Sequence, residues 1–211
     1  MDAVVEILKG LDYSPLYVSL KTGIVKAIAD GILTLPMVLP PTAAGFFLLL
    51  LFSRRRPFGI LLYEQFGIKV VQTWAGCIIA ATVIAFPLMY RNARAAFEQI
   101  DVNLIHAART LGMPEYKIFW KVAVPSAGPG LVAGTILTFA RALGEYGATS
   151  MLAGNIPGKT GTISQRIAMV IQDGNYLTAG IWVVIIMLAA FVLIVLMNLV
   201  TGQNTKNIRR W

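Results

Sequence analysis

The sequence predicts an all-α protein that crosses a membrane several times, and three observations support this fold class. Apolar residues make up 57% of the 211 residues and charged residues only 13%, against roughly 25% charged residues in a soluble domain. The apolar residues form long blocks, as in segments that face lipid. The basic residues behind the net charge of +8 lie between these blocks, where cytoplasmic loops concentrate Lys and Arg. No nucleic-acid partner is therefore expected.

Four apolar blocks are long enough to cross a hydrocarbon core, which takes about 20 residues of helix. They lie near 32–52, 73–90, 129–152 and 180–201. The first contains three prolines, at 36, 40 and 41, so its helix is expected to be kinked or broken and to face protein that covers the freed carbonyls. The preceding stretch, 13–30, is too polar and too short to predict a span.

The loops on the two sides of the membrane differ little in positive charge. In a four-span topology the 91–128 loop and the 202–211 tail lie on one side, and the 53–72 and 153–179 loops on the other. The first side holds eight Lys and Arg residues and the second holds six: Arg91, Arg94, Arg109, Lys117, Lys121, Lys206, Arg209 and Arg210 against Arg54, Arg55, Arg56, Lys69, Lys159 and Arg166. This bias predicts a cytoplasmic 91–128 loop and C-terminus, although the run at 54–56 opposes it.

The 101–125 segment predicts two short helices that form a hairpin outside the membrane. Apolar residues recur at helical spacing over 101–111, and Asp101 is a candidate N-cap. Gly112 supplies the left-handed position that ends a helix, while Pro114 and Glu115 suit the first turn of the next. Pro125 is expected to end that second helix.

This hairpin resembles the signature loop of ABC importer permeases, which reads Glu-Ala-Ala, three residues, Gly, nine residues, Ile-x-Leu-Pro. The spacing matches in full, but His106 stands where the family has an acid, which affects any acid-specific salt bridge to the ATPase. The resemblance implies that the loop docks into a groove on a separate cytoplasmic ATPase subunit. The implied coupling residues are His106, Ala107, Ala108, Arg109, Gly112 and Pro125.

Other stretches resemble the molybdate permease family, and sulfate permeases share much of them. They include 35–41 (LPMVLPP), 107–112 (AARTLG), 139–149 (FARALGEYGAT) and 155–158 (NIPG). The resemblance implies one helix-bundle permease domain over 1–211, acting as a multi-pass homodimer in the lipid of a prokaryotic cytoplasmic membrane. It also implies an extracytoplasmic oxyanion-binding protein as partner, molybdate or tungstate as substrate, and sulfate or thiosulfate as the alternative. No cofactor and no enzymatic activity are expected in this chain, because ATP hydrolysis belongs to the partner.

The N-terminal region departs from that family. In relatives the Ser-Leu-Lys stretch is followed by a complete first helix, a basic turn and the Pro-rich helix. Here Ser19-Leu-Lys21 is followed almost at once by Lys26-Ala-Ile-Ala-Asp30, so roughly one helix length of about 20 residues is expected to be absent. Two interpretations stay open: a shortened chain that assembles poorly, or a 13–30 segment that packs peripherally.

Charged residues at membrane depth are candidates for the transport pathway. Arg141 and Glu145 are four residues apart in the third block, so they share a helix face, can form an ion pair and are expected to point inward. They are either a gate or pathway element at the dimer axis, together with Gly144 and Gly147, or a structural ion pair. Small residues at 130 and 134, and at 144 and 148, predict close helix packing.

Two other patterns do not predict sites. The 154–160 segment ends in Gly-Lys-Thr but has three residues between its glycines, where a phosphate-binding loop has four, so it predicts a flexible external loop that meets a binding protein, or a plain connector. A lone His106 does not indicate a metal site, which takes three or four ligands. Among rival classes, a membrane-embedded enzyme lacks a His-Glu-x-x-His or Gly-x-Ser-x-Gly pattern here, and an energy-independent channel would not need the hairpin.

Overall fold

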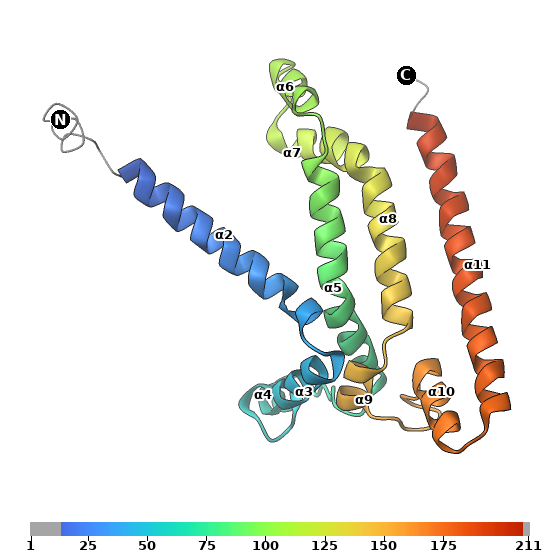
Figure 1. Ribbon diagram of the computed structural model, residues 1–211. Coiled ribbons are helices and arrows are strands. Elements are labelled where there is room, and N and C mark those ends of the chain that lie inside the picture. Colours follow the sequence, from blue (N-terminus) through green and yellow to red (C-terminus); the bar gives the residue numbers. More distant parts are fainter. Residues whose placement is uncertain (1–13, 209–211) are drawn as a thin grey trace, which may run out of the picture. The chain divides into compact units, whose positions relative to one another are not determined.

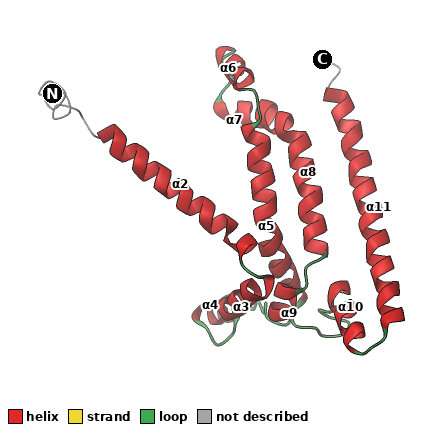
Figure 2. Cartoon of the chain, in the orientation of Figure 1, coloured by secondary structure: helices red, strands yellow, loops and turns green. Residues whose placement is uncertain are grey.

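The computed structural model describes residues 14–208, and all regular structure among them is helical (Figure 2). The predicted tail residues Arg209 and Arg210 lie outside the described residues. The helices are α2 (Ser14–Val38), α3 (Pro41–Phe52), α4 (Pro57–Phe66), α5 (Trp74–Glu98), α6 (Val102–Thr110), α7 (Glu115–Ile118), the π-helix η1 (Phe119–Ala123), α8 (Val124–Leu143), α9 (Gly147–Ala153), α10 (Ile163–Gln172) and α11 (Tyr176–Ile208). The chain divides into two compact units, Met1–Leu35 and Pro36–Trp211.

Three helical runs among the described residues are long and apolar enough to cross a membrane. They are Trp74–Glu98, Glu115–Leu143 and Tyr176–Asn198. The pair Tyr17–Val38 and Pro41–Phe52 makes a fourth if it is taken as one broken span. The all-α polytopic fold predicted from the sequence is therefore confirmed.

The Pro-rich first block is broken, as its prolines predict. The break falls at Leu39 and Pro40, and Pro41 begins α3, because a proline at the first helical position has no N–H that needs an intrahelical partner. The preceding stretch, for which the sequence predicts no span, continues into residues 32–38 as one helix of 25 residues. Its lysines at 21 and 26 interrupt the apolar pattern without ending the helix, since lysine is a good helix former.

The third predicted span, 129–152, is not one helix. α8 ends at Leu143, residues 144–146 are not helical, and α9 begins at Gly147. At this break the Glu145 carboxylate accepts the Ala148 N–H at 2.8 Å, in the first turn of α9. The hydrophobic pattern of the block continues through the break and therefore hides it.

α5 and α8 lie side by side in the unit formed by Pro36–Trp211 (Figure 1). A Cβ added at Gly130 would lie 2.6 Å from the Ala96 Cβ, and one at Gly134 would lie 2.6 Å from the Asn92 Cβ. Small residues allow such a close approach of helices. The predicted packing role of this glycine pair is confirmed, whereas Gly144 and the alanine at 148 lie on either side of the helix break.

The Pro36–Trp211 unit has two distinct ends. α6 and α7 lie at one end of the α5–α8 pair, and α3, α4, α9 and α10 lie at the other (Figure 1); we call these the hairpin end and the opposite end. A small core at the opposite end contains Ala44, Val70, Ala80, Ile84, Ala148 and Leu152. The Gln72 N–H also donates to the Leu152 carbonyl at 3.1 Å, so the segments before α5 and after α8 are fixed to each other.

Candidate functional site

The turn of the α6–α7 hairpin is defined by backbone hydrogen bonds around Gly112. Its φ is 71°, in the left-handed region that favours glycine. The Met113 N–H donates to the Ala108 carbonyl at 3.2 Å, and the Gly112 N–H donates to the Arg109 carbonyl at 2.9 Å. This is the Schellman pattern of a helix C-terminus. The predicted glycine turn is confirmed.

Two side-chain interactions also hold the hairpin. The Asp101 carboxylate accepts the Asn103 N–H at 2.9 Å and caps α6, as predicted. Beyond the turn, Arg109 donates to both carboxylate oxygens of Glu115, through Nε at 2.7 Å and Nη2 at 3.3 Å. The hydrogen bond from Arg109 to this carboxylate raises the pKa of the guanidinium. Glu115 therefore links the first turn of α7 to the last turn of α6.

The two alanines of the signature lie on different sides of α6. Ala107 is exposed, as are His106 and Arg109, but Ala108 is only 5% exposed and is buried within this chain. Ala108 therefore does not contribute to the exposed face of α6 that carries Ala107, because a residue one position further along a helix turns by about 100°. Leu111 at the turn is 80% exposed and is the most prominent apolar side chain of the hairpin.

Pro125 does not end the second helix of the hairpin, contrary to the sequence prediction. The chain continues from α7 through η1 into α8 without leaving the helix, and Pro125 lies in the first turn of α8. The Val124 N–H donates to the Phe119 carbonyl, five residues back. A π-turn of this kind shifts the hydrogen-bond ladder by one residue, which accommodates the proline ring and its missing N–H. The hairpin is thus continuous with a candidate membrane helix.

The predicted pathway residues lie at the break between α8 and α9. Arg141 Nη1 donates to Glu145 Oε2 at 3.1 Å, and the Glu145 side chain is 2% exposed against 40% for Arg141. The other oxygen of Glu145 holds the Ala148 N–H. Gly147 is buried, and a Cβ there would lie 3.1 Å from Pro41 and Thr42 of α3. Gly144 ends α8 and has no such neighbour.

The partly exposed guanidinium of Arg141 lines a cavity of about 130 Å³. The other lining residues are apolar and come from the first broken block and from α5: Pro36, Met37, Leu39, Pro41, Ile84 and Leu88. One of the two charges of the pair is therefore enclosed by protein, and the other faces a small space between helices.

The loop at 154–161 is held by hydrogen bonds from two buried side chains, Thr160 and Gln165. Thr160 is 2% exposed, and its hydroxyl accepts the Ile156 N–H at 2.9 Å and donates to the Gly154 carbonyl at 3.3 Å. Gln165 is fully buried, and its amide donates to Ser150 Oγ and to the Gly154 carbonyl, each at 3.1 Å. These bonds fix the loop to the end of α9.

The sequence did not reveal the role of Glu115 in the hairpin. It lies six positions from Arg109, whereas side chains on one helix meet when their residues are three or four positions apart. Only the reversal at Gly112 brings the two side chains into contact. The role of the buried Gln165, in contrast, could have been predicted from the sequence. A threonine followed three residues later by a glutamine is the pattern of a capping box, and the structure contains this capping box at the start of α10.

These features define an all-α polytopic membrane protein in which a short helical hairpin is continuous with a membrane helix. Over residues 16–209 the chain matches the family described as "Binding-protein-dependent transport system inner membrane component". The chain belongs to this family.

Several relatives in this family are transport permeases. The chain is 46% identical over 147 residues to the molybdenum transport system permease protein ModB of Escherichia coli K12, covering 70% of this chain and 64% of the relative. It is 41% identical over 169 residues to the putative molybdenum transport system permease protein YvgM of Bacillus subtilis, covering 80% and 74%. It is 35% identical over 173 residues to the sulfate transport system permease protein CysT of Escherichia coli K12, covering 82% and 62%. The chain thus spans less than two thirds of the length of the ModB relative.

Proposed function

We propose that this chain is the membrane-spanning subunit of an ABC importer for molybdate or tungstate, driven by a separate cytoplasmic ATPase. The α6–α7 hairpin would dock on the ATPase, and an oxyanion-binding protein would deliver the substrate from outside. The subunit would act as a homodimer in the cytoplasmic membrane of a prokaryote, with the pathway along the two-fold axis. The chain itself carries no chemistry of ATP hydrolysis in this proposal.

The hairpin is the observation that carries the proposal. A rigid turn with an exposed apolar tip at Leu111 is suited to insertion into a groove of another protein, because an anchor that is already ordered loses little entropy on binding. Its continuity with α8 through η1 provides a rigid connection from that tip to the break at Arg141 and Glu145. Movement of a docked partner could therefore reach the pathway through one helix.

The choice of substrate rests on similarity. The chain is 46% identical to a molybdenum permease and 35% identical to a sulfate permease of the same organism, so molybdate is favoured and sulfate is the second candidate. Molybdate, tungstate and sulfate are tetrahedral dianions, and the same pathway could pass any of them. Arg141 would offer the dianion a positive charge at the helix break, and Glu145 and Gly147 would hold that break in place.

Docking is tested with a variant on the exposed face of the hairpin. Ala107→Glu places a charge next to His106 without filling buried space, so the chain should insert and dimerise normally but lose copurification with its ATPase. Gln99→Glu adds the same charge to an exposed residue just before the hairpin and should leave copurification unchanged. Normal copurification of Ala107→Glu, with normal ATP-driven transport, would contradict the docking role.

A further inference from the structure

A tight turn at the opposite end of the Pro36–Trp211 unit joins α10 to the start of α11. Gly174 in this turn has a φ of 75°, and the Asn175 N–H donates to the Val170 carbonyl at 3.0 Å. The Asn175 side chain then caps α11 by accepting the Thr178 N–H at 3.1 Å. The two helices lie side by side from this turn (Figure 1), so residues equally far from the turn along the chain come together.

A cavity of about 360 Å³ lies between these two helices and the 155–161 loop. Arg166 of α10 and Trp182 of α11, which are equally far from the turn, both line it, and Pro157, Ile163 and Met169 give the rest of its wall a largely apolar character. Among the described residues that line the cavity, Arg166 alone is charged, and it forms no ion pair with another described residue. The cavity therefore combines one unbalanced cation with an apolar wall.

The position of Trp182 in α11 places this cavity near a membrane surface. The candidate span Tyr176–Asn198 has 23 residues and is about 34 Å long, slightly more than the roughly 30 Å of a hydrocarbon core. Trp182 lies in the second turn of this span, close to the boundary between headgroups and hydrocarbon, where tryptophan is enriched. Arg166 borders the same cavity, and a cation at this depth is costly without an anionic partner.

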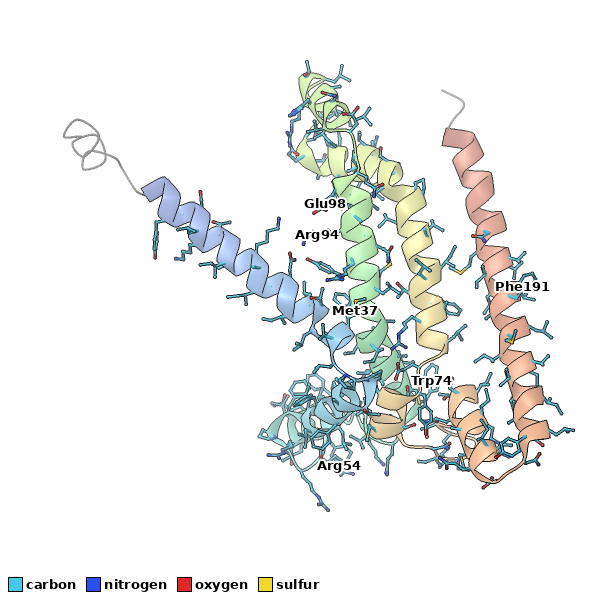
Figure 3. The ribbon with its side chains drawn as sticks, viewed as in Figure 1. Met37, Arg54, Trp74, Arg94, Glu98 and Phe191 are labelled. Atoms are coloured by element: carbon cyan, nitrogen blue, oxygen red, sulfur yellow. The ribbon has the colours of Figure 1, made fainter. Side chains whose placement is uncertain are left out.

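The apolar surface of α11 continues from the cavity into the membrane span. Ile185 lies three positions beyond Trp182, on the same face of the helix, and its side chain is exposed, as is that of Ile181. Figure 3 shows Phe191 projecting from α11 further along the span. An acyl chain can pack along this surface while its headgroup stays at the cavity.

We propose that this cavity binds the phosphate group of an anionic phospholipid in the adjoining leaflet. The Arg166 guanidinium donates hydrogen bonds to the phosphate oxygens, and Ile163 and Trp182 cover the glycerol region and the first part of the acyl chains. A phosphodiester carries one negative charge, which one arginine balances, whereas a transported dianion would stay half neutralised against an apolar wall. This lipid site requires neither the docking role of the hairpin nor a particular transported substrate.

The experiment counts the lipids that bind to the purified, delipidated chain by native mass spectrometry. Phosphatidylglycerol and phosphatidylcholine with identical acyl chains are titrated separately, because both contain a phosphate and only the first has a net negative charge. Wild type should bind one phosphatidylglycerol more tightly than any phosphatidylcholine. The same lipid should raise the unfolding temperature, since a ligand of the folded state stabilises it.

Three variants locate the binding site. Arg166→Gln removes the cation and should weaken binding of the first phosphatidylglycerol about tenfold, as expected for the loss of a hydrogen bond to a charged group. Lys159→Gln is the matched control, because it removes the same charge from an exposed residue of the neighbouring loop that does not line the cavity; binding should be unchanged. Pro157→Glu leaves Arg166 in place and adds an acid to the wall, so it should also weaken binding.

Unfolding temperatures measured without lipid show whether each variant is folded, and Pro157→Glu decides the question if Arg166→Gln does not fold. Equal losses with Arg166→Gln and Lys159→Gln would show that only net charge matters and would overturn the site. Unchanged binding by folded Arg166→Gln or folded Pro157→Glu would also overturn it. Displacement of phosphatidylglycerol by millimolar molybdate or phosphate, with Arg166-dependent binding of the free ion, would assign the cavity to a soluble oxyanion instead.

Discussion

Gly45 of α3 and Ala148 of α9 meet with their backbones in contact. A Cβ added at Gly45 would lie 2.6 Å from the Ala148 Cα and 2.8 Å from its carbonyl oxygen, and Ala148 itself is fully buried. This crossing joins the broken first block to the short helix that follows Glu145. The geometry of the proposed pathway therefore depends on the absence of a side chain at Gly45.

Gly45→Ala should destabilise the protein, because the added methyl group meets backbone atoms that cannot move away. Overpacking of this kind costs about 1 to 3 kcal/mol, which thermal unfolding of the detergent-solubilised protein would detect. Gly180→Ala is the matched control, since no atom lies within 4 Å of a Cβ there and alanine suits a helix interior better than glycine. Equal unfolding temperatures for wild type and Gly45→Ala would show that the crossing is looser than described.

The Arg141–Glu145 pair should separate folding from transport in a double variant. Glu145→Ala removes the buried acceptor of the Ala148 N–H and should cost about 1 to 3 kcal/mol of stability, whereas Glu145→Gln keeps an acceptor and should cost less. Glu145→Gln alone leaves the Arg141 guanidinium without its partner. Adding Arg141→Met removes that charge, so the unfolding temperature should return toward the wild-type value while molybdate transport stays low. Transport at the wild-type rate by this folded double variant would reduce the pair to a structural role.

The ion pair across the hairpin turn predicts rescue by charge exchange. Arg109→Glu and Glu115→Arg each place like charges opposite one another, so each should weaken copurification with the ATPase. The double variant restores an opposite-charge pair in reversed order and should recover most of the binding. If the double variant binds the ATPase no better than Arg109→Glu alone, Arg109 contacts the partner directly and does not act by positioning α7.

Topology is tested by labelling single cysteines in intact cells. In a Cys77→Ser background, Lys159→Cys at the opposite end should react with a membrane-impermeant maleimide, and His106→Cys in the hairpin should react only after the membrane is opened. Both positions are exposed, so burial does not explain a failure to react. Labelling of His106→Cys from outside would place the hairpin on the wrong side for a cytoplasmic ATPase.

The sequence predicted the features that depend on local chemistry. Asp101 caps α6 and Gly112 ends it because capping needs only a short polar side chain or a left-handed residue at the right position. The close approach at Gly130 and Gly134 followed from their spacing on one face of α8. The prolines of the first block likewise predicted a break, because a proline lacks the N–H that would bond to the preceding helical turn.

The features that the sequence did not reveal depend on contacts between distant segments or on an alternative hydrogen-bond pattern. At the break after Leu143 the Glu145 carboxylate binds the Ala148 N–H of α9, and α9 is in turn held against Gly45, more than 90 positions earlier in the chain. Pro125 predicted a helix end, but the helix continues through it. The π-helix η1 accommodates the proline with a hydrogen bond from the Val124 N–H to the carbonyl five residues back. The hydrogen bonds that hold the 154–161 loop include the one from Gln165 to Ser150, and no local pattern brings these two residues together.

The most direct test of the account is ATP-driven uptake of labelled molybdate by proteoliposomes that contain this chain, its ATPase and its binding protein. We expect uptake that requires ATP and the binding protein, that unlabelled tungstate inhibits more strongly than sulfate, and that Gly112→Val abolishes. The valine should distort the turn, because a left-handed conformation costs a non-glycine residue roughly 1 to 2 kcal/mol, while the membrane helices should still assemble. Uptake that proceeds equally without ATP, or that Gly112→Val leaves at the wild-type rate, would contradict the proposal that this chain is a permease coupled to an ATPase through its hairpin.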